Sequence, residues 1–296
     1  MASGSVENLP RPIGYVLGGG GSLGAIQVGM LQALMERDVR PDLVVGTSVG
    51  SINGAVLASD PTGAAHRLSH AWTRMTRDRV FPGGLIAQAL LLQRVKTHLF
   101  PNTGLAEVIT EFLGETTDFT DLSLPFAAVT MDVATAAPHV LRSGPLLPAL
   151  LASSAIPGIY PPVSHDGLRL YDGGVVANVP MRQAVAMGAR SLIVLDCFFP
   201  GQLPASTDTI ADIVLYTALV TMRSQAVAEA ALVAEELPVV YLPGPSPKLV
   251  SPLDFSHTAA LIEDAYTYAR RFLDNLRLTA GPGLYGQHPP EAGVLA

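Results

Sequence analysis

The 296-residue chain has little of several things that would assign it to other classes of protein. Cys197 is the only cysteine, which excludes an intramolecular disulfide framework and is typical of a reducing compartment. Charged residues make up only 15%, and the formal net charge of −7 argues against a nucleic-acid surface. A membrane span requires about 18 uninterrupted apolar residues, and no stretch of the chain reaches that length. The first twelve residues lack a basic patch followed by an apolar block, so no signal peptide is predicted and a cytoplasmic protein is expected.

What the chain has in plenty is hydrophobic residues, at 49%, with a mean hydropathy of +0.36. Two interpretations of this composition stay open. One is exposed apolar surface around a greasy substrate or a peripheral membrane contact. The other is a large core beneath an ordinary surface. Cys197 follows the apolar run 192–195, so we expect it to be a packing residue rather than a reactive thiol.

The order of patterns predicts an α/β fold. An apolar strand at 13–17 runs into a glycine loop and a helix, and a second strand at 43–45 runs into a serine turn and another helix. This alternation is typical of a mostly parallel sheet with helices on both faces. No break in composition divides the chain, so we predict one domain over 13–278, with a flexible N-terminus at 1–12 and a flexible tail at 279–296.

The stretch Gly46-Thr47-Ser48-Val49-Gly50 follows the second strand and precedes a helix. A serine on such a sharp turn has its hydroxyl exposed at the carboxyl end of the sheet, and the flanking glycines let the backbone bend. Ser48 is therefore a candidate nucleophile. The plainer interpretation is a tight turn in which Ser48 caps the helix.

The loop Gly19-Gly20-Gly21-Ser22-Leu23-Gly24 also lies between a strand and a helix, and it has two interpretations. Its G-x-G-x-x-G spacing fits a dinucleotide site, but that site needs an acidic residue at the end of the next strand. Asp42 lies before that strand instead. Alternatively, the backbone N–H groups form an anion cradle, next to Ser48, for the oxygen that becomes negative during attack on an ester.

A serine nucleophile needs a base, and the sequence offers two. His257, the best placed of seven histidines, would complete the order Ser48, Asp172, His257 of a triad hydrolase, but it could equally be a solvent-facing histidine. Asp172 follows a strand-like run and precedes Gly173 and Gly174, so it could accept the proton itself. On its own it could also be an ordinary Asp-Gly turn.

Taken together and in this order, these segments resemble the patatin-like phospholipases over about residues 13–276. The motifs that carry the resemblance are Gly19–Gly24, Gly46–Gly50 and Asp172–Gly174, with flanking support from Ala152–Pro157, Asn178–Pro180 and Asp254–Ser256.

The resemblance implies a Ser48–Asp172 dyad and an oxyanion hole made by the N–H groups of Gly19, Gly20 and Gly21. Its supporting motif glycines are Gly24, Gly46, Gly50, Gly173 and Gly174. It also implies a three-layer α/β/α fold, hydrolysis of acyl esters of phospholipids, lysolipids or neutral lipids, and no metal or cofactor. Leu23 departs from the pattern, since many members carry Arg or Lys there. That difference favours a neutral ester or a lysolipid.

One further segment, Leu85–Leu99, has apolar residues on one helical face. It is either a lid or lipid-touching helix, or an ordinary amphipathic helix that faces the core. Acyl length, headgroup and oligomeric state do not follow from the sequence.

Overall fold

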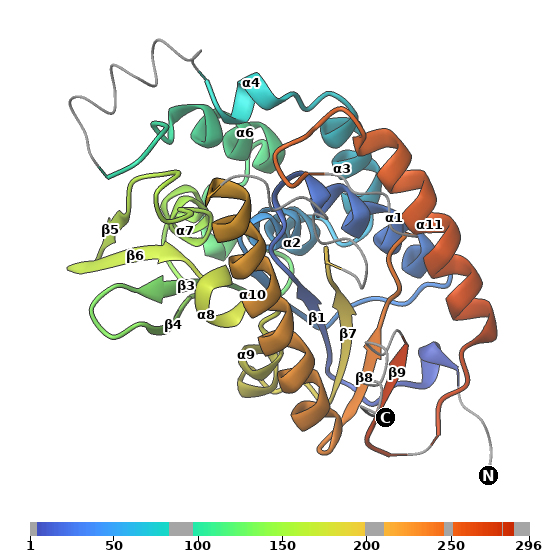
Figure 1. The fold of residues 1–296 in the computed structure, drawn as a ribbon. Coiled ribbons are helices and arrows are strands. Elements are labelled where there is room, and N and C mark those ends of the chain that lie inside the picture. The colour runs from blue at the N-terminus through green and yellow to red at the C-terminus, as the bar shows by residue number, and fades with distance from the viewer. Residues whose placement is uncertain (1–4, 83–96, 199–209, 246–250, 280, 287–296) are drawn as a thin grey trace.

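The structure is a computed structural model that describes residues 5–82, 97–198, 210–245, 251–279 and 281–286. Figure 1 shows a central sheet with helices on both faces. The sheet has nine strands in the order β5-β6-β3-β2-β1-β7-β8-β9, with β4 paired to β3. Strands β1, β2, β3, β7, β8 and β9 run parallel, whereas β4, β5 and β6 are antiparallel additions at one end. The predicted mostly parallel sheet is confirmed.

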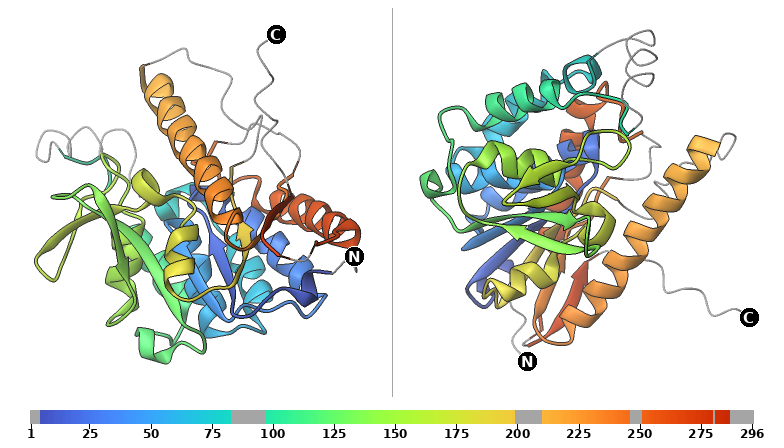
Figure 2. Two further views of the ribbon diagram at one scale, coloured as in Figure 1. Left: turned by 90° about the horizontal axis from the view of Figure 1, so that it is seen from below. Right: turned by 90° about the vertical axis from the view of Figure 1, so that its left-hand side faces the viewer.

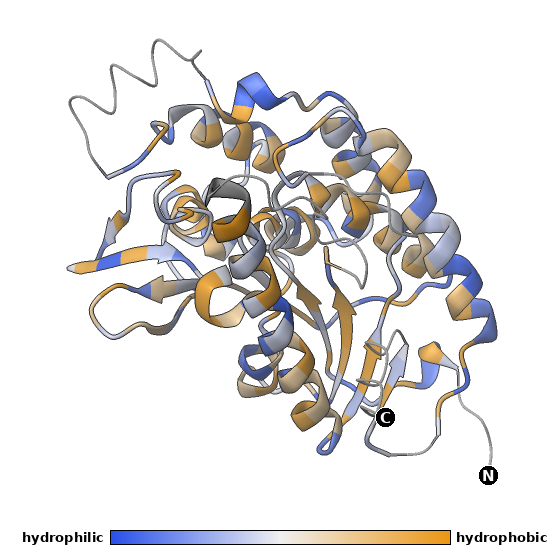
Figure 3. Cartoon of the chain, viewed as in Figure 1, coloured by the Kyte–Doolittle hydropathy of each residue, from blue (hydrophilic) through white to orange (hydrophobic). Residues whose placement is uncertain are grey.

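The strand bounds follow the apolar runs of the sequence. The strands are β1 (Ile13–Leu17), β2 (Leu43–Thr47), β3 (Phe126–Asp132), β4 (Ala137–Leu141), β5 (Val163–His165), β6 (Leu168–Asp172), β7 (Ser191–Leu195), β8 (Pro238–Tyr241) and β9 (Gly283–Gly286). All five residues of β1, β2 and β7 are buried, because helices cover both faces of these central strands. Figure 3 shows β7 and β8 as hydrophobic and the outer turns of α11 as hydrophilic.

Two hydrophobic clusters, one on each face of the sheet, make the three layers. Alternate residues of one strand go to opposite clusters, as Tyr15 and Val16 do. One face carries α1 (Gly24–Met35), α2 (Val49–Ser59), α3 (Ala64–Thr73), α6 (Thr103–Leu113), α7 (Leu146–Ser153) and α11 (Thr258–Asn275). The other carries α9 (Met181–Ala186) and α10 (Ile210–Ala234), as Figure 2 shows from the side. The predicted three-layer α/β/α architecture is confirmed.

The register of β3 brings two distant strand ends together. Strand β2 pairs with the first half of β3, where Thr47 lies opposite Val129. Strand β6 pairs with its second half, where Asp172 lies opposite Thr130. Because β4 occupies the other edge of β3, β2 and β6 share one edge and run toward each other. Their carboxyl ends therefore meet between two neighbouring residues of β3.

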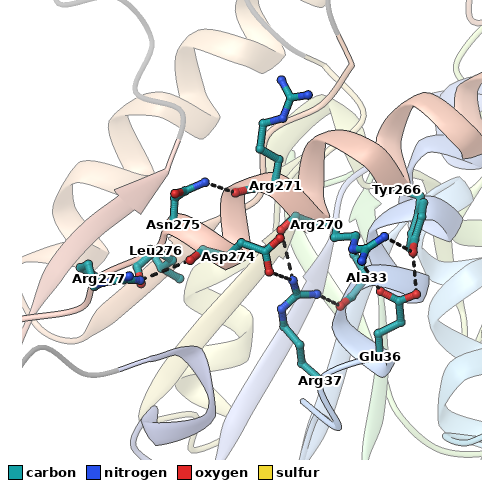
Figure 4. A network of polar contacts seen from close by, with 10 residues as sticks. All are labelled: Ala33, Glu36, Arg37, Tyr266, Arg270, Arg271, Asp274, Asn275, Leu276 and Arg277. Carbon is teal, nitrogen blue, oxygen red and sulfur yellow. Dashed lines mark hydrogen bonds and ion pairs between the residues drawn. The ribbon is translucent and has the colours of Figure 1, made fainter.

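Helix α1, which follows the glycine loop, lies against α11 along its length. Polar contacts hold the far end of this pair, where Arg37 bridges Ala33 O and Asp274, and Tyr266 donates to Glu36 at 2.5 Å (Figure 4). Since these contacts are exposed, we assign most of the stabilisation of the pair to its buried apolar face.

Both predicted flexible ends need correction. Val6 and Leu9 are buried in the core, and Arg11 pairs with Asp42 at 2.5 Å, so residues 5–12 are packed onto the domain. In the predicted tail, β9 pairs in parallel with β8. Glycine content alone does not exclude a strand at a sheet edge, where partner hydrogen bonds supply order. Residues 287–296 lie outside the described part.

The sequence pattern between residues 64 and 79 predicts one helix, but the structure has two. Helix α3 ends at Thr73, and the four-residue α4 (Arg77–Val80) follows. Most of the predicted Leu85–Leu99 segment, up to residue 96, lies outside the described residues.

Candidate active site

Ser48 lies on a strained turn between β2 and α2. Its backbone has φ 54° and ψ −129°, a conformation that a residue with a side chain rarely adopts. The turn is held by its surroundings, since the Ser48 N–H donates to Ser153 Oγ at 3.0 Å and Ser51 Oγ donates to Ser48 O at 2.7 Å. Ser48 is 7% exposed, so the hydroxyl faces an enclosed space rather than bulk water.

The glycines on either side of Ser48 are required by close backbone contacts. A Cβ on Gly46 would lie 2.3 Å from the carbonyl oxygen of Gly50, and one on Gly50 would lie 2.2 Å from that of Leu17. Such distances are prohibitive for any side chain. The G-x-S-x-G pattern thus reflects packing of the turn against its own backbone and against β1.

The glycine loop after β1 lies directly beside Ser48. A Cβ on Gly19 would be 3.1 Å from Ser48 Cβ. The Gly19 N–H already donates to Asn178 O at 3.1 Å. By contrast, the N–H groups of Gly20 and Gly21 donate to no group among the described residues, and both glycines are partly exposed. Of the three expected donors, two are therefore available to a ligand and one is occupied.

Buried hydrogen bonds hold this loop from below. Gln27 Nε2 donates to Gly18 O at 2.7 Å and to Leu195 O at 3.0 Å. Asn53 Nδ2 donates to Gln27 Oε1 at 2.8 Å, and Trp72 Nε1 donates to Asn53 Oδ1 at 3.0 Å. Each polar group in this series of hydrogen bonds has a partner. The series therefore fixes the position of the glycine loop relative to Trp72.

Segment 251–255 and Cys197 hold the loop from other sides. The Ser22 N–H donates to Pro252 O at 2.8 Å. Cys197 is fully buried, and a Cβ on Gly20 would lie 2.4 Å from its Cβ. Burial raises the pKa of the Cys197 thiol, with the Asp196 carboxylate adding to that effect, so the structure agrees with a packing role.

Asp172 lies at the end of β6, next to Ser48. Asp172 is 5% exposed and accepts from the Gly174 N–H at 2.7 Å, and the Ser48 hydroxyl lies close enough to lower the pKa of its carboxyl. Burial raises its pKa to about 6, while the hydrogen bonds from Ser48 and Gly174 act in the lowering direction. A carboxylate that loses its proton near pH 6 is a competent general base at neutral pH.

Gly173 and Gly174 follow Asp172 in the chain and shape its turn. A Cβ on Gly173 would lie 2.4 Å from Val129 O, so this glycine lets β6 end tightly against β3. A Cβ on Gly24, at the start of α1, would lie 2.5 Å from the Val49 side chain. These glycines therefore allow the Asp172 turn to pack against β3 and the glycine loop to pack against the start of α2.

His257 has a different environment. Its side chain is 53% exposed, and its Nδ1 contacts Asp254 at 3.1 Å and Ser256 Oγ at 2.9 Å. Its carboxylate neighbour is thus Asp254 rather than Asp172, which removes the geometric basis for the triad.

The dinucleotide interpretation also lacks its second anchor. Asp42 lies at the opposite end of β2 from Ser48, where it binds Arg11 and the Ile13 N–H. Among the described residues, no group of three His, Cys, Asp or Glu side chains could hold a metal ion.

An apolar cavity with a volume of about 60 Å³ lies against Ser48 and is partly open to solvent. Aromatic side chains form much of the wall, with Trp72 stacked on Phe255 at 6.3 Å and Phe81 stacked on Tyr160 at 5.7 Å. Leu23 points instead into the core, at 3% exposure.

Sequence reasoning missed three contributors to the site. Ser153 holds the Ser48 backbone, Asn178 occupies the Gly19 N–H, and Trp72 connects the cavity wall to the loop. Ser153 and Asn178 fall in the flanking segments that carry the family resemblance, but no spacing rule gives their roles. Trp72, the one tryptophan, lay on a helix predicted without a site.

The chain matches the model of the patatin-like phospholipases over residues 15–185. It belongs to the patatin-like phospholipase family. The family is one of serine hydrolases, and the matched region contains the glycine loop, Ser48 and Asp172. The match ends inside α9, so β7, β8, β9, α10 and α11 lie beyond it.

Curated relatives share the same region. The chain is 35% identical over 188 residues to mouse patatin-like phospholipase domain-containing protein 7, covering 62% of this chain and 13% of that protein. It is 32% identical over 193 residues to lysophospholipase NTE1 of Mycosarcoma maydis, covering 62% and 10%. This patatin-like chain thus spans only a small part of the length of these relatives.

Among solved structures, VipD from Legionella pneumophila aligns with 90% of this chain and 67% of that one, at 13% identity and a TM-score of 0.46. No helix in the described ranges is both long and apolar enough to cross a membrane.

Proposed function

We propose that this protein is a lipid acyl hydrolase that cleaves carboxylic esters through an acyl-Ser48 intermediate, with Asp172 as the base. The observation that carries the proposal is that the register of β3 brings the buried Asp172 next to Ser48, which lines an apolar cavity. Supporting it are the Gly20 and Gly21 N–H groups, which have no partner among the described residues and belong to the loop that lies against Ser48 at Gly19, and the family membership of the chain.

The first half of the reaction uses these groups in order. Ser48 Oγ attacks the ester carbonyl carbon while its proton passes to Asp172. The Gly20 and Gly21 N–H groups donate to the oxyanion that forms, and each such donor is worth roughly 3–4 kcal/mol. Asp172 then gives the proton to the leaving alkoxide oxygen, and the acyl chain stays on Ser48. Gly19 supports this step by letting the loop approach Ser48 without a side chain.

The cavity favours a lipid substrate. Its wall is nearly all apolar, so an acyl chain is expected to bind there by desolvation rather than by polar contacts. Buried Leu23 offers no charge to a phosphate, which favours neutral esters over substrates that bind through a charged headgroup. One relative is named a lysophospholipase, so lysolipids are the second substrate class in the proposal.

Peripheral contact with a membrane surface is part of the proposal. Exposed apolar residues lie along the first half of α10, with Val214 64% and Ile213 48% exposed. A lipid surface is a plausible occupant for such residues in an enzyme whose substrate is carried in membranes. We also propose that the packed chain, from residue 5 through β9, acts as one catalytic domain.

A fluorophosphonate probe tests the nucleophile directly. We expect the probe to label one site, Ser48, as read by peptide mass spectrometry, and Ser48→Ala to lose both labelling and hydrolysis of p-nitrophenyl butyrate and 1-palmitoyl-lysophosphatidylcholine. Retention of esterase activity by Ser48→Ala would refute the mechanism. Tight NAD binding with an unlabelled Ser48 would instead favour the dinucleotide interpretation.

A further inference from the structure

Ser154, at the end of α7, carries a buried hydroxyl without a hydrogen-bond partner. The residue is 5% exposed, and its Oγ is one of two such buried side-chain atoms in the described part of the chain. A hydroxyl removed from water and left unpaired is destabilising, so its retention in a native structure calls for an explanation.

Ser154 is one of the residues that line the same cavity as Ser48. Other polar side chains in that lining already have partners. Trp72 Nε1 donates to Asn53 Oδ1 at 3.0 Å, and Tyr160 OH donates to Val80 O at 2.8 Å. Among the described residues of the lining, Ser154 therefore carries a buried hydroxyl whose hydrogen-bonding capacity is unused and available to a bound molecule.

The neighbours of Ser154 contact both members of the proposed dyad. Ser153 Oγ accepts from the Ser48 N–H at 3.0 Å, and Ala155 O accepts from the Asp172 N–H at 3.0 Å. Strands β2 and β6 end against neighbouring residues of β3, so Ser48 and Asp172 follow each other along one edge of that strand. Ser154 therefore lies between the residue that holds the Ser48 backbone and the residue that holds the Asp172 backbone.

We propose that Ser154 binds the water that hydrolyses the acyl-Ser48 intermediate. This inference rests on the proposed function. An attacking water has two O–H groups and must direct a lone pair at the acyl carbon. One O–H gives its proton to Asp172, and the other needs an acceptor, which the unpartnered Ser154 Oγ supplies in a cavity wall that is otherwise nearly all apolar.

The step balances without any further reactant. The water oxygen bonds to the acyl carbon, one proton moves to Asp172, and the tetrahedral intermediate collapses by breaking the bond from that carbon to Ser48 Oγ. Ser48 Oγ takes the proton back from Asp172, and the free fatty acid leaves. Acylation uses no water, so Ser154 acts in the second half of the reaction alone.

Competition between water and methanol separates this role from others. Methanol has one O–H, which Asp172 accepts, and carries a methyl group where water has its second O–H. With p-nitrophenyl butyrate in aqueous methanol, Ser154→Ala is expected to raise the ratio of methyl butyrate to butyrate about tenfold. In water alone, kcat should fall about tenfold with kcat/KM nearly unchanged, and a burst of p-nitrophenol should show that the acyl-enzyme accumulates.

Two results would overturn the proposal. An equal loss in kcat and kcat/KM, without a burst or a change in product ratio, would mean that Ser154 contacts the ester or the oxyanion during acylation. Unchanged kinetics would mean that no bound water depends on it.

Matched variants complete the test. Ser154→Thr retains a hydroxyl and should restore the wild-type product ratio. Ser191→Ala removes a buried hydroxyl far from the cavity, where Ser191 Oγ donates to Pro10 O, and should leave the ratio unchanged. If Ser154→Ala does not fold, Ser154→Cys replaces it, since a thiol is a weak hydrogen-bonding group of similar size.

Fluorophosphonate labelling distinguishes a failure of the proposed function from a failure of the proposed role of Ser154. A wild-type protein that is not labelled at Ser48 refutes the proposed function. Labelling at Ser48 in both wild type and Ser154→Ala, with no change in the product ratio, refutes the role of Ser154 alone.

Discussion

Asp172 and His257 are the two side chains that the sequence offers as a base for Ser48, and they lie in opposite environments. Asp172 is 5% exposed and ends β6 next to Ser48, whereas the His257 side chain is 53% exposed and contacts Asp254. Burial raises the pKa of Asp172 to about 6, which suits proton transfer at neutral pH. The comparison supports the proposed role of Asp172 as the base, because its buried environment raises the pKa of its carboxyl toward neutral pH while His257 has another carboxylate as its neighbour.

The largest expected effect comes from changing these two residues in turn. Asp172→Asn should lower kcat/KM for p-nitrophenyl butyrate by about 10³-fold, because an amide cannot accept the proton of Ser48. His257→Ala should retain activity within about twofold, since its ring contacts only exposed neighbours. Thermal melting of both variants checks that they fold, and a larger loss in His257→Ala than in Asp172→Asn would restore the triad.

The next largest effect concerns the donors that complement the base. In Gly20→Ala the new Cβ would lie 2.4 Å from Cys197 Cβ, so the loop must move and take its N–H groups with it. We expect kcat to fall about 100-fold with a smaller change in KM. Adding Cys197→Gly to this variant removes the clashing atom and should recover part of the loss. No recovery would mean that the Gly20 backbone, rather than the clash, is at fault.

A smaller effect separates the cavity from the dyad. Val108 is 5% exposed and lines the cavity from α6. Val108→Phe should shift the ratio of kcat/KM for p-nitrophenyl butyrate over palmitate about tenfold toward the short chain, because the larger ring fills space near the acyl chain. Thr110→Phe, on the exposed side of α6, is the control. Equal losses for both esters would argue that the chain binds elsewhere.

The smallest effect is on stability, and it has a defined sign. The pKa of Asp172 is raised in the folded state from 3.8 to about 6, so the native protein binds this proton more tightly than the unfolded chain. The free energy of unfolding of the wild type therefore falls as the pH rises from about 4 through 6, and this decrease is at most about 3 kcal/mol. Asp172→Asn carries no such charge and should melt a few degrees above wild type at pH 7.5, with the difference shrinking toward pH 4. A difference independent of pH would mean that Asp172 is not held in a desolvated site.

Much of the fold followed from local patterns. The apolar run at 13–17 predicted β1 with its bounds, and the strand-like run at 191–197 predicted β7, which ends two residues earlier, because strands buried on both faces have continuous hydrophobic sequence. The buried position of Cys197 was also predicted. Strand β9 was missed, since its glycine-rich sequence carries no strand signal and its order comes from pairing with β8.

The site was only partly accessible to sequence reasoning. Motifs located Ser48, the glycine loop and Asp172, but their meeting depends on the register of β3, where two strands end on adjacent residues. Hydrogen bonding to Asn178 removed Gly19 from the available donors, and no sequence pattern encodes that contact. In the cavity wall Trp72 stacks on Phe255, although the two residues are far apart in the sequence. Only tertiary packing brings them together.

The pH dependence of Ser48 labelling tests the choice of base most directly. The rate of reaction with a fluorophosphonate probe should fall below a midpoint near pH 6, as Asp172 takes up its proton, and the profile should be the same in wild type and His257→Ala. Asp172→Asn should show slow labelling without that midpoint. A midpoint that persists in Asp172→Asn and disappears in His257→Ala would contradict the account.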